Sequence, residues 1–182
     1  SVSAAFAVVN RIDDFAYTPE QNIAHAMTAL MAQNKGAGKI DRMKEGFRCG
    51  IILETIYGIL IFIICFALAR PLMMMFVKDE EVIGHGVTYL HLISVMYLLP
   101  ALTNGIQGFF RGIGDLKITL ISSFINMALR VLAAAPLVFI WKMGIEALPY
   151  SYLAGWIGML VAETPLLLKT YKTWGKKGET PC

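Results

Sequence analysis

Three carboxylates stand near the start of an otherwise apolar sequence, at Asp13, Asp14 and Glu20. In a low-dielectric interior a carboxyl group can bind a proton and exchange it for a cation near neutral pH. These residues are therefore candidate proton or cation sites. Asp14 has a second possible role, because Arg11 lies one helical turn away and could form an ion pair with it.

Further polar side chains recur at intervals of three or four residues, which places each series on one side of a helix. Such stripes should line a shared hydrated interior, because polar groups facing hydrocarbon are costly. The three stripes are Asn10, Asp14, Tyr17, Gln21, His25 and Thr28, then Thr103, Asn104, Gln107 and Arg111, and then Thr119, Ser122, Asn126 and Arg130. With the three carboxylates, the substrate- or ion-binding candidates are Tyr17, Gln21, Asn104, Gln107, Asn126 and Arg130.

Two of these residue types suggest specific roles. The rings of Phe15, Tyr17 and Tyr97 could stack on flat organic cations, although packing against the core or lipid is the commoner role of such rings. Arg130 would repel a cation, so we expect it mainly to tie helices together through Asn126 or a carboxylate.

The candidates lie in apolar segments long enough to cross a bilayer, which takes about 20 helical residues. With 57% hydrophobic and 16% charged residues, the chain differs from a soluble domain, in which about 25% are charged. We predict an all-α, polytopic membrane helical bundle of about five transmembrane helices. A soluble bundle is disfavoured because residues 56–69 have no polar face. The expected spans are 2–33, 49–69, 87–110, 118–141 and 147–168. The first carries several ionisable residues, so its assignment rests on the loop and spans after it rather than on its own hydropathy.

Basic residues are distributed unevenly among the connections between these segments. The first, third and fifth connections hold eleven Lys and Arg residues, and the second and fourth hold three. Cytoplasmic loops carry the excess of basic residues. We therefore expect a multi-pass protein of the plasma membrane whose C-terminus is cytoplasmic.

Two connections combine glycine with basic residues, Gln-Asn-Lys-Gly-Ala-Gly-Lys at 33–39 and Arg-Gly-Ile-Gly-Asp-Leu-Lys at 111–117. Glycine allows the left-handed backbone angles that end one helix and turn the chain into the next. The basic side chains suit contact with the anionic inner leaflet. We expect both motifs to set the topology rather than to contact substrate.

These two motifs, in this order and after a helix that contains Asn10-Arg-Ile-Asp13 and Pro19, resemble the second half of a MATE (multidrug and toxic compound extrusion) transporter. The resemblance extends over essentially the whole chain. It implies that residues 1–182 are a partial C-terminal lobe, similar to helices eight to twelve of a twelve-helix, two-lobe protein. Its partners would be the first helix of the same lobe and the N-terminal lobe, both outside this sequence.

The resemblance also implies an activity, namely secondary active antiport of organic, usually cationic, drugs or toxins in exchange for H⁺ or Na⁺. No cofactor is implied besides that coupling ion. Some members of the family use a carboxylate on the helix that here carries Pro100 and Asn104, and its absence argues against a sodium site there. The coupling ion stays open between H⁺ and Na⁺.

Two other classes of membrane protein stay open beside this one. A flippase or exporter of lipid-linked saccharides would need several basic residues for pyrophosphate, and only Arg11 and Arg130 lie deep in spans. A non-transporting scaffold would not need aligned polar stripes. No catalytic motif or metal-ligand spacing occurs, so we predict neither an enzyme nor a metal protein. The net charge of +3 lies in loops at lipid headgroups and does not imply a nucleic-acid partner.

Overall fold

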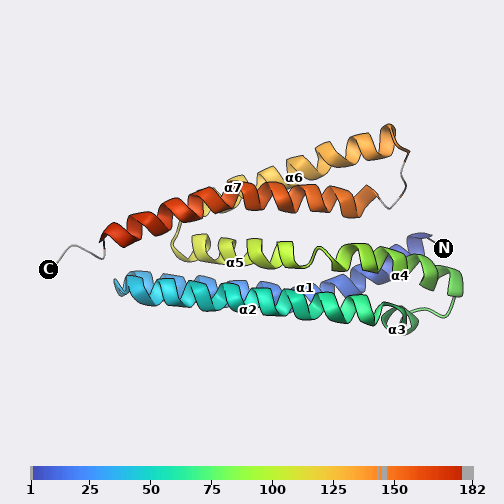
Figure 1. Ribbon diagram of the computed structural model, residues 1–182, viewed down its shortest axis with the longest axis horizontal. Coiled ribbons are helices and arrows are strands. Elements are labelled where there is room, and N and C mark those ends of the chain that lie inside the picture. The colour runs from blue at the N-terminus through green and yellow to red at the C-terminus, as the bar shows by residue number, and fades with distance from the viewer. Residues whose placement is uncertain (1, 143, 145–146, 178–182) are drawn as a thin grey trace.

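The computed structural model describes residues 2–142, 144 and 147–177, with side chains as far as Thr173. Within these residues the chain forms seven helices and no strand. They are α1 (Val2–Gly36), α2 (Ile40–Ala67), α3 (Ala69–Met74), α4 (Glu80–Ser94), α5 (Leu98–Gly112), α6 (Leu116–Phe139) and α7 (Ala147–Lys177). The long helices run back and forth along one axis and form an elongated bundle (Figure 1). The prediction of an all-α membrane bundle is confirmed.

Three helices are long and apolar enough to cross a membrane: α2, α6 and the Ala147–Thr173 part of α7. Taken together as one broken span, α4 and α5 are also long and apolar enough to cross a membrane. Helix α1 has 35 residues, so its length of about 52 Å would also cross a bilayer. Because of its ionisable residues, α1 is not among the helices that are apolar enough to cross a membrane, as the sequence led us to expect.

The third expected span, 87–110, corresponds to two helices rather than to one continuous helix. The chain breaks at residues 95–97, and the axes of α4 and α5 differ by 47°. Pro100 lies in the first turn of α5, and a proline ring clashes with the carbonyl group four residues earlier, here that of Met96. The break therefore lies about one turn before the proline that explains it.

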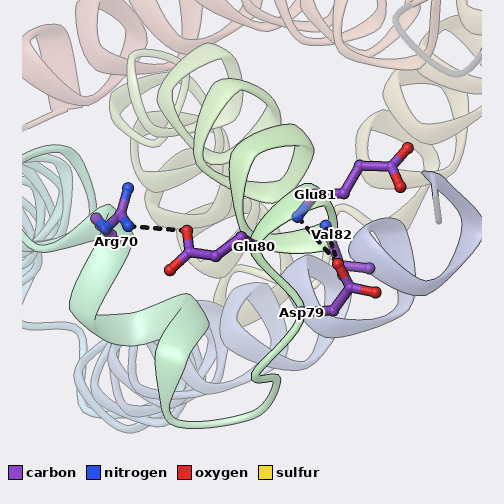
Figure 2. Close-up of polar contacts among 5 residues, drawn as sticks. All are labelled: Arg70, Asp79, Glu80, Glu81 and Val82. Carbon is purple, nitrogen blue, oxygen red and sulfur yellow. Dashed lines mark hydrogen bonds and ion pairs between the residues drawn. The ribbon is translucent and has the colours of Figure 1, made fainter.

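Helix α4 begins at a capped turn that follows the short helix α3 (Figure 2). The Asp79 Oδ1 atom accepts hydrogen bonds from the backbone N–H groups of Glu81 at 2.9 Å and Val82 at 3.4 Å. Beside this cap, Arg70 and Glu80 form an ion pair of 2.8 Å. Both side chains of the pair are exposed, so the cap contributes more to the position of the turn than the ion pair does.

Helix α5 lies at the centre of the bundle, between α1 and α2 on one side and α7 on the other (Figure 1). Two glycines bring it close to α1. A Cβ atom at Gly108 would lie 2.6 Å from the Ala24 carbonyl oxygen, and one at Gly112 would lie 2.6 Å from that of Thr28. The Thr28 hydroxyl donates to the Gly108 carbonyl at 3.1 Å. Glycines four residues apart allow such close contact between membrane helices.

The two glycine-rich loops meet at the end of the bundle opposite α3 (Figure 1). The Lys35 ammonium group, at the end of α1, donates a hydrogen bond to the Ile113 carbonyl that follows α5. Gly38 and Gly114 both have left-handed backbone angles, with φ of 67° and 80°. One end of the bundle therefore collects both basic loops, which is the arrangement that the charge asymmetry requires.

Two apolar clusters fill the bundle, one toward each end. Val9, Leu90 and Ile93 belong to the first, and Met31, Phe109 and Phe110 belong to the second, beside the glycine-rich loops. Between the clusters along α1 lies a buried acidic residue, Glu20. The middle of the bundle is therefore its polar layer.

Candidate functional site

A pocket of about 340 Å³ opens between α1, the break before α5, α6 and α7. Four of the sequence-predicted residues line it: Asp13, Asp14, Tyr17 and Arg130. Three aromatic residues that lie far from α1 in the sequence, Tyr97, Tyr152 and Trp156, complete much of its wall. The pocket therefore combines carboxylates with aromatic rings.

The rotation of α1 decides which of its polar residues reach this pocket. Its buried face follows the helical repeat through Ile12, Ala16 and Glu20. Asp13 and Tyr17 flank that face and are half-buried, whereas Asp14 is exposed at the edge of the pocket. Gln21 is exposed and does not line the pocket.

Aromatic residues join the helices around the pocket. The rings of Tyr17 on α1 and Trp156 on α7 have centroids 6.4 Å apart. The Arg130 guanidinium carbon lies 3.9 Å from the centroid of the Tyr152 ring. Arg130 thus connects α6 to α7 as expected, but its partner is an aromatic ring rather than Asn126 or a carboxylate. This difference arises because the helix packing places Tyr152 under the guanidinium group, which stacks well on aromatic faces.

The ion pair that we considered between Arg11 and Asp14 does not form. Among the described residues the ion pairs are Arg70–Glu80 and His85–Glu81, both near the α3–α4 turn. Arg11 and Asp14 are both exposed, so neither charge is buried and neither requires an ion-pair partner. The Asp14 carboxylate is therefore available at the rim of the pocket.

Glu20 lies outside the pocket and is only 2% exposed. Its neighbours include Tyr17 on α1 and Asn104 on α5. The Glu20 Oε1 and Asn104 Nδ2 atoms are both buried without a partner in hydrogen-bond geometry. Tyr17 borders the pocket as well as this group, so it lies between Glu20 and the pocket.

Sequence reasoning missed Glu54, which lies near the middle of α2 and is 0% exposed. Both of its carboxylate oxygens are buried without a hydrogen-bond partner. It lies within electrostatic range of Glu20, and it contacts α5 at Gly105. The available signal was a single acidic residue inside an apolar span, which is by itself a reason to suspect a functional site.

Sequence reasoning also missed Glu163, a single acidic residue near the middle of α7. Its side chain is 0% exposed. Its Oε1 atom accepts a hydrogen bond of 3.3 Å from the Gln107 side-chain amide, and Ser122 lies nearby. Its Oε2 atom is buried without a partner. Glu163 is thus the centre of a separate polar group between α5, α6 and α7.

Two predicted residues belong to this second group and not to the pocket. The side-chain amides of Gln107 and Asn126 both approach the sulfur of Met159, at 3.9 Å and 3.6 Å. Within the described part of the chain, no three His, Cys, Asp or Glu side chains gather as a metal site. Apart from the exposed Gln21, the predicted residues thus separate into a pocket group, a group around Glu20 and a group around Glu163.

The family model MatE matches residues 2–135. The probable multidrug resistance protein YoeA of Bacillus subtilis is 29% identical over 184 residues, which cover 97% of this chain and 38% of that protein. The probable multidrug resistance protein NorM of Thermotoga maritima is 25% identical over 150 residues, which cover 82% and 31%. The chain therefore spans less than two-fifths of the length of these relatives.

Solved structures share the arrangement of helices. The MATE transporter ClbM in complex with Rb⁺ matches with a TM-score of 0.85 and 16% identity, over 94% of this chain and 39% of that chain. An inward-facing multidrug resistance MATE family transporter of the MOP superfamily matches with a TM-score of 0.77 and 17% identity, over 98% and 41%. At these identities the likeness shows a common fold.

Proposed function

This chain belongs to the MATE family, and from that membership we propose that it is part of a secondary active antiporter. The proposed antiporter exports organic, mainly cationic, drugs or toxins in exchange for H⁺ or Na⁺. Relatives described as probable multidrug resistance proteins support this proposal. So does the fold shared with MATE transporters.

The proposal of a cationic substrate rests on the pocket. Its volume of about 340 Å³ is within the usual range of roughly 300–1,000 Å³ for small-molecule sites. Asp13 and Asp14 supply negative charge, and the rings of Tyr17 and Trp156 supply faces that attract a cation. This combination fits a flat organic cation better than an anion or a sugar.

Exchange requires that binding of the coupling ion and binding of the substrate disfavour each other. A protonated or ion-bound carboxyl group attracts an organic cation less than a free carboxylate does. In two-lobe carriers one lobe rocks against the other around a site at their interface. On this mechanism the chain supplies one wall of the site, and the first helix of its lobe and the N-terminal lobe supply the remainder.

The flippase alternative fits the pocket less well. Of the residues that line it, Arg130 is the one with a basic side chain, and its guanidinium lies over Tyr152. Two carboxylates at the same pocket would repel a pyrophosphate group. A scaffold would have no use for Glu20, Glu54 and Glu163, whose burial without charge partners is costly in a membrane. We thus propose that the protein acts in transport across the plasma membrane rather than in chemical catalysis.

Transport of a fluorescent organic cation tests this proposal. The complete protein is reconstituted in liposomes, and ethidium uptake is measured under imposed H⁺ or Na⁺ gradients. We expect gradient-driven uptake, and we expect Asp13→Asn to lower it. Asp41→Asn, which changes an exposed residue at the start of α2, is the matched control. Equal uptake by the two variants would remove Asp13 from the site, and absence of uptake under both gradients would contradict the function.

A further inference from the structure

Two buried acidic residues lie on facing stretches of α1 and α2, between the contact of Tyr57 with Ala16 and the contact of Gly50 with Met27. Glu20 lies in the buried face of α1, where Ala16 and Ala24 occupy the preceding and following turns. Glu54 lies in the buried face of α2. The two side chains are 2% and 0% exposed, so protein atoms enclose both almost completely.

Helix α5 closes this space from the third side. Asn104 lies beside Glu20, and Gly105 lies against the side chain of Glu54. A Cβ atom at Gly105 would lie 2.7 Å from Ile51 Cδ1, so the glycine allows α2 and α5 to approach closely at this level, with Glu54 Cγ 3.5 Å from the same position. The Glu54 side chain therefore lies at the close contact between α2 and α5.

Within the described part of the chain, no positive charge compensates this pair. Among the described residues, the titratable groups that act on it are Asp13 and Tyr17 from α1 and Tyr57 from α2. The α5 helix presents the neutral Asn104, and no titratable group of the described parts of α3 or α4 acts on either glutamate. The Tyr57 hydroxyl is already committed, because it donates to the Ala16 carbonyl at 2.8 Å.

Two ionised carboxylates cannot persist in such a place. Three of the four oxygens of the pair are buried without a hydrogen-bond partner, the two ions would repel each other, and Asp13 would also repel Glu20. One proton on the pair removes the repulsion between the two carboxylates. Paired carboxyl groups that share a proton are a known solution to this problem.

A metal ion would satisfy the pair less well than a proton. Metal cations that bind oxygen need several ligands around them. Within the described residues no third acidic, His or Cys side chain joins the two glutamates as a metal site would require. A proton needs only the two carboxyl groups.

We propose that Glu20 and Glu54 form the site that binds the exchanged proton, separate from the pocket that binds the organic cation. This proposal rests on the proposed antiport function and assigns its coupling ion. On release, the O–H bond of the carboxylic acid breaks, the proton passes to water, and a carboxylate stays on the protein. Tyr17 borders both the pair and the pocket, so a cation in the pocket stabilises the negative pair by charge.

The test uses the complete protein in proteoliposomes, with ethidium as the transported cation. We expect a pH gradient to drive uptake without Na⁺. Glu54→Gln should lose this uptake but should still bind ethidium, because residue 54 does not line the pocket. Glu45→Gln, an exposed change on the same helix, should keep it. Loss of proton-driven uptake in Glu54→Gln but not in Glu45→Gln supports the proposal.

A second measurement does not depend on transport. Infrared spectra of the protein labelled with carboxyl-¹³C glutamate should show the C=O stretch of a buried protonated acid, and Glu54→Gln or Glu20→Gln should remove or shift it. If Glu54→Gln does not reach the membrane, the labelled wild-type protein and Glu54→Asp take its place. Absence of the acid band in the wild-type protein overturns the proposal.

Two results separate this proposal from the function on which it rests. Uptake driven by Na⁺ without a pH gradient, and unchanged in Glu54→Gln, would leave the antiporter intact and overturn the proton site. Absence of uptake under any gradient would contradict the antiporter, and the infrared band would then decide whether the pair holds a proton.

Discussion

The Gln107 side chain of α5 donates a hydrogen bond of 3.3 Å to the Glu163 carboxylate of α7, and both residues are buried. This contact joins the central helix to the α6–α7 hairpin in the middle of the bundle. Asn126 of α6 lies in the same group through the sulfur of Met159. Three consecutive helices thus share one polar contact region, in which Gln107 and Glu163 are 56 residues apart in the sequence.

Removal of the donor in this contact should destabilise the protein. Gln107→Leu leaves Glu163 buried without its amide partner, which costs about 1–3 kcal/mol or more for a charged group. The expected result is a lower unfolding temperature in detergent. Gln33→Leu, the same change at an exposed position near the end of α1, is the control. The double variant Gln107→Leu/Glu163→Leu should recover stability, because it leaves no unpaired group. Equal unfolding temperatures for Gln107→Leu and Gln33→Leu would show that the contact has no energetic role.

The aromatic wall of the pocket should contribute to cation affinity. Trp156→Ala removes a ring that faces Tyr17, and a cation–π contact is worth about 0.5–2 kcal/mol. We expect the dissociation constant for ethidium to rise by roughly 2- to 30-fold, measured by fluorescence titration of the complete protein. Trp141→Ala, at an exposed position after α6, should leave it unchanged. A similar small effect of both variants would argue against binding in this pocket.

The close approach of α5 and α1 depends on Gly108. In Gly108→Ala the new Cβ atom would lie 2.6 Å from the Ala24 carbonyl oxygen, and a backbone atom cannot move aside cheaply. Overpacking of this kind typically costs about 1–3 kcal/mol, so the unfolding temperature should fall. Gly84→Ala on α4 is the matched control, because no atom lies within 4 Å of its new Cβ. There the helix should be unchanged or slightly more stable. Normal stability of Gly108→Ala would mean that the two helices can separate without cost.

The charge asymmetry makes a prediction about orientation. Lys39, in the first glycine-rich loop, should be cytoplasmic, and Glu80, at the start of α4, should be outside. Single cysteines at these positions, in a background without Cys49, Cys65 and Cys182, can be tested in intact cells with an impermeant thiol reagent. We expect labelling of residue 80 and none of residue 39. The opposite pattern would reverse the topology, and with it the side from which the pocket is entered.

The wall that α1 contributes to the candidate pocket was accessible to sequence reasoning because it depends on one helix. The spacing of Asp13 and Tyr17 places both beside the buried face of α1, whichever helices pack there. Arg130 was recognised because it continues the polar stripe of Ser122 and Asn126 along one side of its helix. Its partner could not be predicted, since Tyr152 comes into range only when α6 and α7 pack together.

The sequence alone determined that this is a helical membrane protein of the MATE type, because hydropathy, basic loops and glycine turns are properties of short stretches of chain. Only the tertiary structure brought Glu54 to Glu20 and Glu163 to Gln107. In sequence each missed glutamate was a single acid in an apolar span, with no sign of a partner. Whether such a side chain meets lipid, water or another helix depends on how its helix is rotated. Packing against helices distant in the chain sets that rotation, so hydropathy along one segment cannot reveal it.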